Sequence, residues 1–363
     1  MVNHLIEQYT ITTTPKYNFP QPSIDATLPQ RFTELSLYSL RHVRNQHIQL
    51  NQQGFQQLNN IEFVNSIQLK PQPIALNPRR EPCIVAAVDT SSIKIGETAT
   101  GMLVAVRGAT VWKQNQKYRY TRLGPFIFHI TEENKREVYD TLQRAYFGLS
   151  NSNGHQSLPG IMQMPMRIAG LLERWLQTML SRTINKGLIL FDGSLTSGTS
   201  DTPIHLMREI LAAARKRENI VLAFSKMTNL RINGHLITDV LPEHRPPYLL
   251  ETHGLSARPP ILLLGDIYVA RFSKEKYAFR LDIDKETHFP DRIKAVEKLI
   301  GNELLSQSYP ETLRLAHILC TFTANEVIAM QHFAVRKCGL SIVERPDMHK
   351  VLFGPFSKGE CYA

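Results

Sequence analysis

Two short apolar runs, each followed directly by an aspartate, constrain the fold of this chain more than any other feature. The runs are Cys83–Val88 before Asp89 and Leu188–Phe191 before Asp192. Apolar residues without alternation are typical of a strand that is buried on both faces. A carboxylate beside such a strand loses water and needs a compensating partner, for which a metal ion is one candidate. The commoner role of a strand-end aspartate is to begin a turn, and Gly193 favours a turn after Asp192.

The order of the remaining segments predicts an α/β fold with a mixed sheet. Short β-rich stretches punctuated by Gly108, Gly124 and Pro125 follow Asp89 and predict antiparallel hairpins. A strand, a helix and a second strand follow around Asp192, which predicts a parallel pair. The expected strands are 102–106, 110–112, 117–121, 126–130, 219–225, 261–264 and 278–283, and the expected helices are 132–147, 166–183 and 203–217.

The helix expected over residues 166–183 carries an apolar stripe with one carboxylate on its flank. The stripe consists of residues at helical spacing, namely Ile168, Leu171, Leu172, Trp175, Leu176 and Met179. Glu173 has Ala169, Leu176 and Leu180 as neighbours on its own face. It is therefore either a border residue that reaches solvent or a functional carboxylate.

Two helices are expected near the C-terminus. Ser308–Glu311 opens the first, with Pro310 favourable at the first position, and His317 lies on it. Thr323–Glu326 is a capping-box sequence that begins the second helix, which ends near Gly339. Taken alone, His317 is more often a hydrogen-bonded core histidine than a metal ligand.

The composition favours a polyanionic partner such as nucleic acid. The 363 residues include 42 Lys and Arg against 32 Asp and Glu, which gives a net charge of +10. The four cysteines include no C-x-x-C pair and fit reduced thiols in a cytoplasmic protein. The N-terminus lacks a signal-peptide pattern, and no apolar run approaches the ~20 residues of a membrane span.

Three parts are expected along the chain. Residues 1–80 form an N-terminal arm (1–30) with a helical extension (about 30–60), 81–345 form the main domain, and 346–363 form a C-terminal tail. Residues 231–260, with five prolines and three histidines, predict a surface insertion rather than a metal site.

A second pair of aspartates, Asp282 and Asp284, resembles the D-x-D motif of haloacid dehalogenase phosphatases. Glu286 stands where that motif has Thr, which argues against a phosphatase site here.

The order Asp89, Glu173, Asp192 and His317 matches the ribonuclease H-like fold, in which acidic residues of the first strand, first helix and fourth strand converge. Two divalent cations about 3.5–4 Å apart activate a water and stabilise the leaving oxygen in phosphodiester cleavage. Carboxylates suit Mg²⁺ or Mn²⁺, and an imidazole shifts the preference towards Mn²⁺. Because close carboxylates repel one another, we expect the cluster to function only with metal bound.

Over roughly residues 80–345 the sequence resembles the NurA nuclease family. The segments that carry the resemblance are Ala86–Ser91, Leu172–Arg174, Leu190–Leu195, Phe224–Lys226, Ser308–Pro310 and Ala316–His317. The Asp-Gly-Ser-Leu and Tyr-Pro…Ala-His elements discriminate best. Thr90 departs from the family, which usually has Gly after the first Asp, and is expected to alter a backbone turn while keeping the carboxylate.

The resemblance implies the residues of an active site. Those implied as catalytic are Asp89, Glu173, Asp192, Tyr309 and His317. All except Tyr309 would bind metal, as two Mn²⁺ ions with Mg²⁺ as the alternative, while Tyr309 would assist near the scissile phosphate.

Candidates for DNA contact lie outside this set. The resemblance implies Lys226 as a phosphate contact, and the basic side of the helix over 203–217 adds Arg208 and Arg215. For the two arginines, a solvated helix face is the alternative explanation.

The activity implied by the resemblance is that of a Mn²⁺-dependent 5′–3′ exonuclease with single-strand endonuclease activity. Members of the family resect double-strand breaks in DNA as homodimers docked on a hexameric HerA-type ATPase translocase. A catalytically weak DNA-binding adaptor subunit of a translocase is the alternative. A transposase or resolvase is disfavoured by the Tyr-Pro…Ala-His element.

Overall fold

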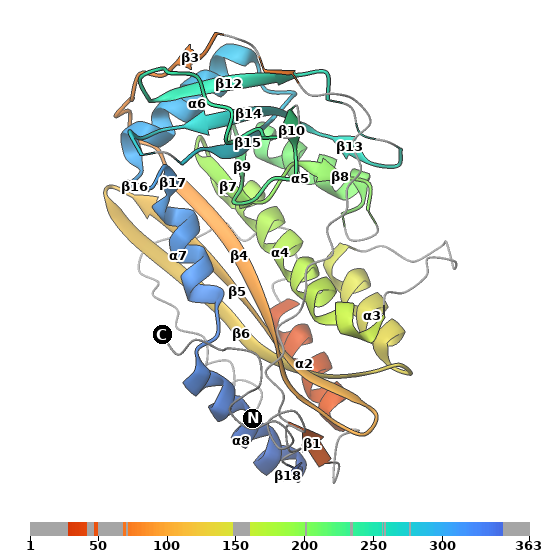
Figure 1. The fold of residues 1–363 in the computed structure, drawn as a ribbon. Coiled ribbons are helices and arrows are strands. Elements are labelled where there is room, and N and C mark those ends of the chain that lie inside the picture. The colour runs from red at the N-terminus through yellow and green to blue at the C-terminus, as the bar shows by residue number, and fades with distance from the viewer. Residues whose placement is uncertain are drawn as a thin grey trace, which may run out of the picture.

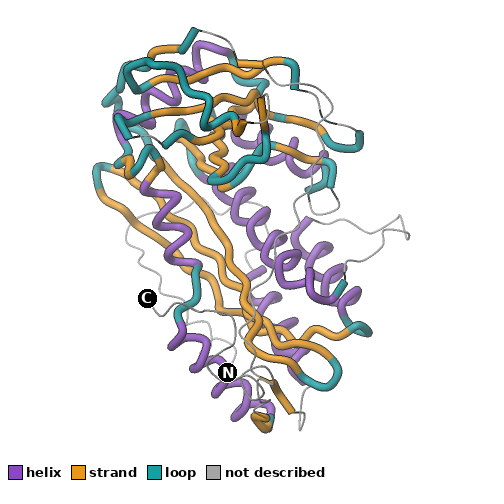
Figure 2. The backbone as a smooth tube through the Cα atoms, in the orientation of Figure 1, coloured by secondary structure: helices purple, strands orange, loops and turns teal. Residues whose placement is uncertain are grey.

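The computed structural model shows a large mixed sheet with helices on both faces (Figure 1). It describes residues 28–41, 47–49, 68–69, 72–147 and 160–343, apart from 200–201, 233–234, 256, 258 and 276. Figure 2 shows three long strands that run from the upper part of the molecule to its lower end. Within the described ranges, no helix is long and apolar enough to cross a membrane.

Five strands in the order β6-β5-β4-β7-β9 form the part of the sheet that carries the site. Antiparallel neighbours are β4 (Val85–Glu97), β5 (Gly101–Gln114) and β6 (Lys117–Thr131). On the other side of β4, the parallel strands are β7 (Leu188–Asp192) and β9 (Ile220–Ser225). This order and these directions confirm the predicted ribonuclease H-like mixed sheet.

The predicted strand boundaries around Asp89 are wrong. β4 does not end at Asp89 but continues to Glu97, so Asp89 lies in mid-strand and no turn forms at Thr90. Gly108 likewise does not end a strand, because it pairs with Thr90 on one side and with Leu123 on the other. Pairing on both sides of β5 overrides the local turn preference, and only a register shift marks the position of Gly108.

The sheet continues beyond β9 with three antiparallel strands, β15 (Phe279–Asp284), β14 (Gly265–Arg271) and β12 (Tyr248–His253). The prediction of a surface insertion over 231–260 is wrong for β12, because Tyr248 and Leu249 are fully buried. The remaining strands of two or three residues are β1 (His47–Gln49), β2 (Gln68–Leu69), β3 (Ile74–Ala75), β8 (Thr196–Ser197), β10 (Arg231–Ile232), β11 (His235–Leu236), β13 (Leu262–Leu263), β16 (Leu305–Ser306), β17 (Tyr309–Pro310) and β18 (Ser341–Val343).

Alternation along β4 and β7 divides the apolar core between the two faces of the sheet. Ala86, Val88 and Phe191 face the core beneath α4, whereas Ala87 and Leu190 face the core beneath α7. The helices on the first face are α2 (Leu28–Arg41), α3 (Lys135–Phe147), α4 (Met164–Thr183) and α5 (Ile204–Lys216). A 3₁₀ turn, Ile161–Gln163, directly precedes α4. The helices on the second face are α6 (Phe289–Asn302) and α7 (Glu311–Cys320).

Two segments outside the central layers match only part of their predictions. The helix expected within residues 30–60 is described as α2, which contacts β6 and buries Phe32; residues 50–60 lie outside the described ranges. Residues 1–27 of the predicted arm over 1–30 and the tail over 346–363 also lie outside them.

The last helix, α8 (Ala324–Cys338), has the ends that the sequence predicted. Thr323 and Glu326 form a capping box, and Gly339 ends the helix in a left-handed conformation with φ 63°. Glu326 also forms an ion pair with the buried Arg107 at 2.8 Å and one with Arg122 at 2.9 Å. These contacts fix the start of α8 to β5 and β6.

Candidate metal-binding active site

Asp89 and Asp192 lie on neighbouring strands where the strands separate. Val88 and Phe191 form the last pair between β4 and β7, and the two aspartates follow directly. Alternation places both on the face of Ala87, the face that α7 covers. The sheet geometry therefore brings together two carboxylates that are 103 positions apart in the sequence (192 − 89). The place where β4 and β7 separate, after Val88 and Phe191, is called the notch below.

His317 on α7 contacts Asp89 directly. Its Nδ1 lies 2.8 Å from Asp89 Oδ2, while the backbone N–H of Thr90 donates to Asp89 Oδ1 at 2.7 Å. Asp89 is buried, but 55% of the His317 side chain is exposed. The pair is thus fixed on the protein side and open on the solvent side.

Cys320 is a third donor beside this pair, and the sequence interpretation did not include it. It follows His317 by three positions on α7, so both side chains share one face of the helix. Cys320 is fully buried, and potential ligand atoms of Asp89, His317 and Cys320 lie within 4.8 Å of one another. Burial and the neighbouring Asp89 raise the pKa of the Cys320 thiol. The His-x-x-Cys spacing was the available signal.

Asp192 is paired with Lys226, which follows β9. Lys226 Nζ lies 2.7 Å from Asp192 Oδ2 and 5.9 Å from the centre of the Tyr309 ring. Burial raises the pKa of Asp192, and the ammonium of Lys226 opposes this shift. Gly193 then takes φ 107°, a conformation that favours glycine, and its N–H donates to Phe224 O at 2.8 Å.

Glu173 lies on α4, the helix that packs on the opposite face of the sheet beside β4. Burial raises the pKa of Glu173 to about 7, opposed by Arg174 and reinforced by the charges of Asp89 and Asp192. Gln177 Nε2 donates to Glu173 Oε1 at 2.9 Å. Of the two alternatives for Glu173, its electrostatic coupling to both aspartates favours the functional carboxylate.

A glycine determines how closely α4 approaches the sheet. A Cβ atom at Gly108 would lie 2.8 Å from Leu176 Cδ1 and 3.1 Å from Leu172 Cδ2. Both leucines flank Glu173 on α4. Gly108 therefore allows the close packing of α4, which carries Glu173, against the sheet.

Tyr309 supplies a buried hydroxyl. The residue is 9% exposed, and its hydroxyl has no hydrogen-bond partner among the residues that the structure describes. Burial and the charges of Asp192 and Asp89 raise the pKa of Tyr309. A buried donor without a partner, beside carboxylates and an imidazole, fits a site that accepts a cation and an anionic ligand.

The basic residues predicted to contact DNA lie in different places. Arg208 is exposed on α5, whereas the guanidinium of Arg215 contacts Asp284 and lies 2.7 Å from Glu286. Asp284 follows Ile283, and Ile283 pairs with Leu222 near the start of β9. Lys226 follows the other end of β9. The structure therefore brings Lys226 to Asp192, whereas Arg215 pairs with acidic residues outside the candidate site.

Asp282 supports the loop that follows Asp192. Its carboxylate accepts two hydrogen bonds from Arg280, each 2.7 Å long, and one from the backbone N–H of Leu195 at 3.0 Å. Asp282 is 1% exposed. These contacts give Asp282 a structural role, in agreement with the exclusion of a D-x-D phosphatase site.

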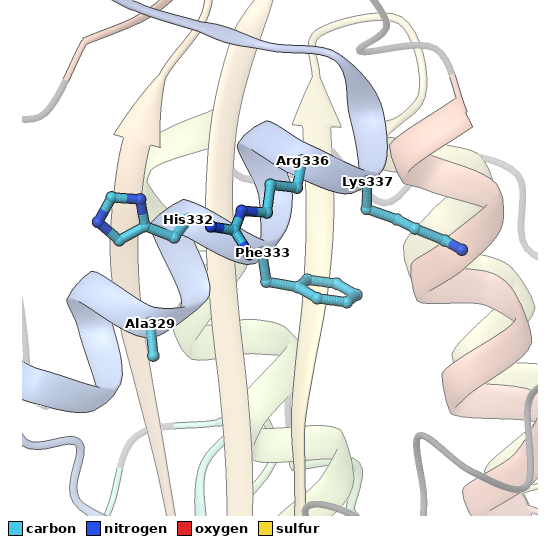
Figure 3. A pocket seen from close by; sticks show the side chains of 5 residues that line it. All are labelled: Ala329, His332, Phe333, Arg336 and Lys337. Carbon is cyan, nitrogen blue, oxygen red and sulfur yellow. The ribbon is translucent and has the colours of Figure 1, made fainter.

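A separate hollow of about 550 Å³ lies on α8 (Figure 3). It is lined by Ala329, His332, Phe333, Arg336 and Lys337. This lining contains no acidic residue and none of the predicted catalytic residues. It is a surface feature distinct from the carboxylate notch.

No protein-family model matches the chain. No curated protein matches it either. Among solved structures, the chain is similar to the NurA nuclease from Sulfolobus solfataricus, with 14% identity and a TM-score of 0.43 over 73% of this chain and 88% of that chain.

Two Argonaute structures show lower similarity. The C-terminal lobe of a budding yeast Argonaute has 12% identity and a TM-score of 0.30 over 70% of this chain and 49% of that chain. The A. aeolicus Argonaute has 10% identity and a TM-score of 0.23 over 69% and 30%. The fold of the present chain is established by its own strand order, as a ribonuclease H-like mixed sheet with a notch of carboxylates at its centre.

Proposed function

We propose that this protein is a metal-dependent nuclease that hydrolyses phosphodiester bonds in DNA. The observation that carries the proposal is the contact of Asp89 with His317 on the sheet face that also carries Asp192, with Glu173 near enough for the charges of both aspartates to act on it. Burial and the charge of Asp89 raise the pKa values of Glu173 and Asp192, although Lys226 pairs with Asp192 and opposes the shift there. Such a cluster is typical of a cation site.

Mn²⁺ or Mg²⁺ would be held by Asp89, Glu173, Asp192 and His317. Bound divalent cations would activate the attacking water and neutralise the charge on the leaving oxygen. Within the protein, the N–H of Thr90 orients Asp89, and Gln177 orients Glu173. The hydroxyl of Tyr309 can donate to a phosphate oxygen, and Lys226 can exchange its contact with Asp192 for one with the phosphate.

The finer assignment is supported by the sequence resemblance to the NurA family. It comprises Mn²⁺-dependent 5′–3′ exonuclease and single-strand endonuclease activity in double-strand-break resection. It also comprises a homodimer in the cytoplasm and a HerA-type hexameric translocase as partner. The net charge of +10 favours DNA as the substrate.

End-labelled linear DNA provides the test. We expect degradation with Mn²⁺ or Mg²⁺ and none with chelator, and we expect Asp192→Asn to abolish it. Asp291→Asn, an exposed aspartate on α6, is the matched control and should retain activity. Metal-dependent DNA binding without cleavage would instead favour an adaptor subunit, and cleavage that persists in Asp192→Asn would refute the proposed site.

A further inference from the structure

A buried thiol beside two proposed metal ligands changes which cations this site accepts. Asp89, His317 and Cys320 offer one oxygen, one nitrogen and one sulfur, all within 4.8 Å of one another. Mn²⁺ and Mg²⁺ prefer oxygen ligands, whereas a thiolate selects softer ions such as Zn²⁺. We propose that Asp89, His317 and Cys320 form a Zn²⁺ site, and that Zn²⁺ bound there blocks the catalytic use of Asp89 and His317.

The geometry requires only small side-chain shifts. With Zn²⁺–N and Zn²⁺–O distances of about 2.0–2.2 Å and a Zn²⁺–S distance of about 2.3 Å, ligand atoms of a tetrahedral site lie roughly 3.3–3.8 Å apart. Asp89 Oδ2 and His317 Nδ1 lie 2.8 Å apart across a hydrogen bond, so they would separate by roughly 0.5 Å to admit the ion. A cation between them would replace the proton that they share.

The helix already presents Cys320 together with His317. The two residues are one turn apart at the end of α7, and Cys320 Sγ donates to His317 O at 3.2 Å. Cys320 is fully buried against Asp89, whereas more than half of the His317 side chain faces solvent. An ion can therefore enter past the imidazole and reach the thiol behind it.

The site has a further donor nearby without a partner. The hydroxyl of Tyr309 is buried, has no hydrogen-bond partner among the described residues and lies close enough to Asp89 for the charge of Asp89 to raise its pKa. Three protein ligands leave the fourth position of Zn²⁺ open to water or an anion. This resembles an open zinc site rather than a closed structural one.

Metal binding can be tested independently of cleavage. The intact metal-free protein is titrated with Cd²⁺, and the thiolate-to-metal charge-transfer absorption is recorded, followed by competition with Zn²⁺. We expect one equivalent of Cd²⁺ to produce the band in the wild type. Cys320→Ser should lose it and bind Zn²⁺ at least about tenfold more weakly, since even outer-shell partners of a metal are worth 10–100-fold.

Two further variants separate ligation from folding. His317→Ala leaves the buried thiol in place and should also weaken Zn²⁺ binding, while Cys338→Ser, which changes a buried thiol on α8, should keep the band. Absence of the band in the wild type, or equal Zn²⁺ affinity in Cys320→Ser, would overturn the proposed zinc site.

The inhibitory part of the proposal depends on the proposed nuclease function. We expect Zn²⁺ to inhibit Mn²⁺-dependent cleavage in the wild type and to inhibit Cys320→Ser at least about tenfold less effectively. A protein that shows the Cd²⁺ band but never cleaves DNA would retain the zinc site and refute the nuclease. A protein that cleaves DNA but shows no Cd²⁺ band would support the nuclease function and refute the zinc site.

Discussion

Asp89 Oδ2 and His317 Nδ1 lie 2.8 Å apart although the two residues are separated by 228 positions in the sequence. The contact joins the central strand β4 to the helix α7 on the face that also carries Asp192. It fixes the imidazole while leaving its outer edge in solvent. The contact therefore holds both side chains at the position of the proposed cation.

Removing the charge of Asp89 should abolish metal-dependent cleavage. We expect Asp89→Asn to lower the rate by more than about a hundredfold, because a direct ligand contributes more than the 10–100-fold of an outer-shell partner. The amide can still accept the N–H of Thr90, so the fold should persist in near-ultraviolet circular dichroism. Activity close to that of Asp291→Asn would show that Asp89 is not a ligand.

Lys226 should compete with metal for Asp192. Without its ammonium, we expect Lys226→Met to bind Mn²⁺ more tightly, by up to about tenfold, in isothermal titration calorimetry. DNA affinity should fall, and the slope of its logarithm against log salt should decrease by about one. Lys226→Arg retains the charge and is the control. Unchanged salt dependence in Lys226→Met would exclude a phosphate contact.

Glu173 should make the metal-free protein less stable as pH rises. Its pKa in the folded state is raised from 4.5 to about 7, so the folded chain holds a proton that the unfolded chain releases. Stability therefore falls between pH 4.5 and about 7, and the loss is complete above about 7. We expect Glu173→Gln to raise the Tm by a few degrees above that range and to change it little below pH 4.5.

The same variant should lose activity, since an amide cannot replace a carboxylate ligand. Thermal unfolding with chelator at several pH values measures the expected pH-dependent rise in the Tm of Glu173→Gln. Glu209→Gln, which changes an exposed residue on α5, is the control. A pH-independent gain in Tm would indicate better packing rather than relief of a buried charge.

Gly108 should be required for the position of α4. A Cβ at Gly108 would approach Leu176 Cδ1 to 2.8 Å, so Gly108→Val should destabilise the fold by about 1–3 kcal/mol through overpacking. It should also weaken Mn²⁺ binding by displacing Glu173. Urea unfolding and calorimetry measure the two effects. If the clash is the cause, adding Leu176→Ala should restore part of the stability and part of the Mn²⁺ affinity. No recovery in the double variant would refute the clash as the cause.

The central fold could be predicted from the sequence because its signals are local, and the same signals singled out the candidate site residues. Apolar runs indicated β4 and β7, and the aspartate after each run indicated the notch. The length of β4 could not be predicted in this way. Thr90, Ser91 and Ser92 have turn propensity, and only pairing with Gly108, Arg107 and Val106 keeps them extended.

Features that depend on distant contacts escaped prediction. Prolines before Tyr248 suggested a loop, but β12 is stabilised by β14, which follows it in the chain. Cys320 became a candidate ligand only when the fold placed Asp89 beside α7. The His-x-x-Cys spacing indicates only that the two side chains share a face of α7, not that Asp89 lies beside them.

The continuation of β4 past Asp89 sets a fixed length in the molecule. Gln331 of α8 donates to Ile95 O at 3.0 Å, six residues along the strand from Asp89. At about 3.3–3.4 Å per residue, that contact lies roughly 20 Å from the carboxylate. β5 pairs with β4 from Asp89 to Lys94, and a register shift between Lys94 and Gly96 marks the position of the contact. The continuation of β4 therefore fixes the distance between α8 and the candidate metal ligand Asp89.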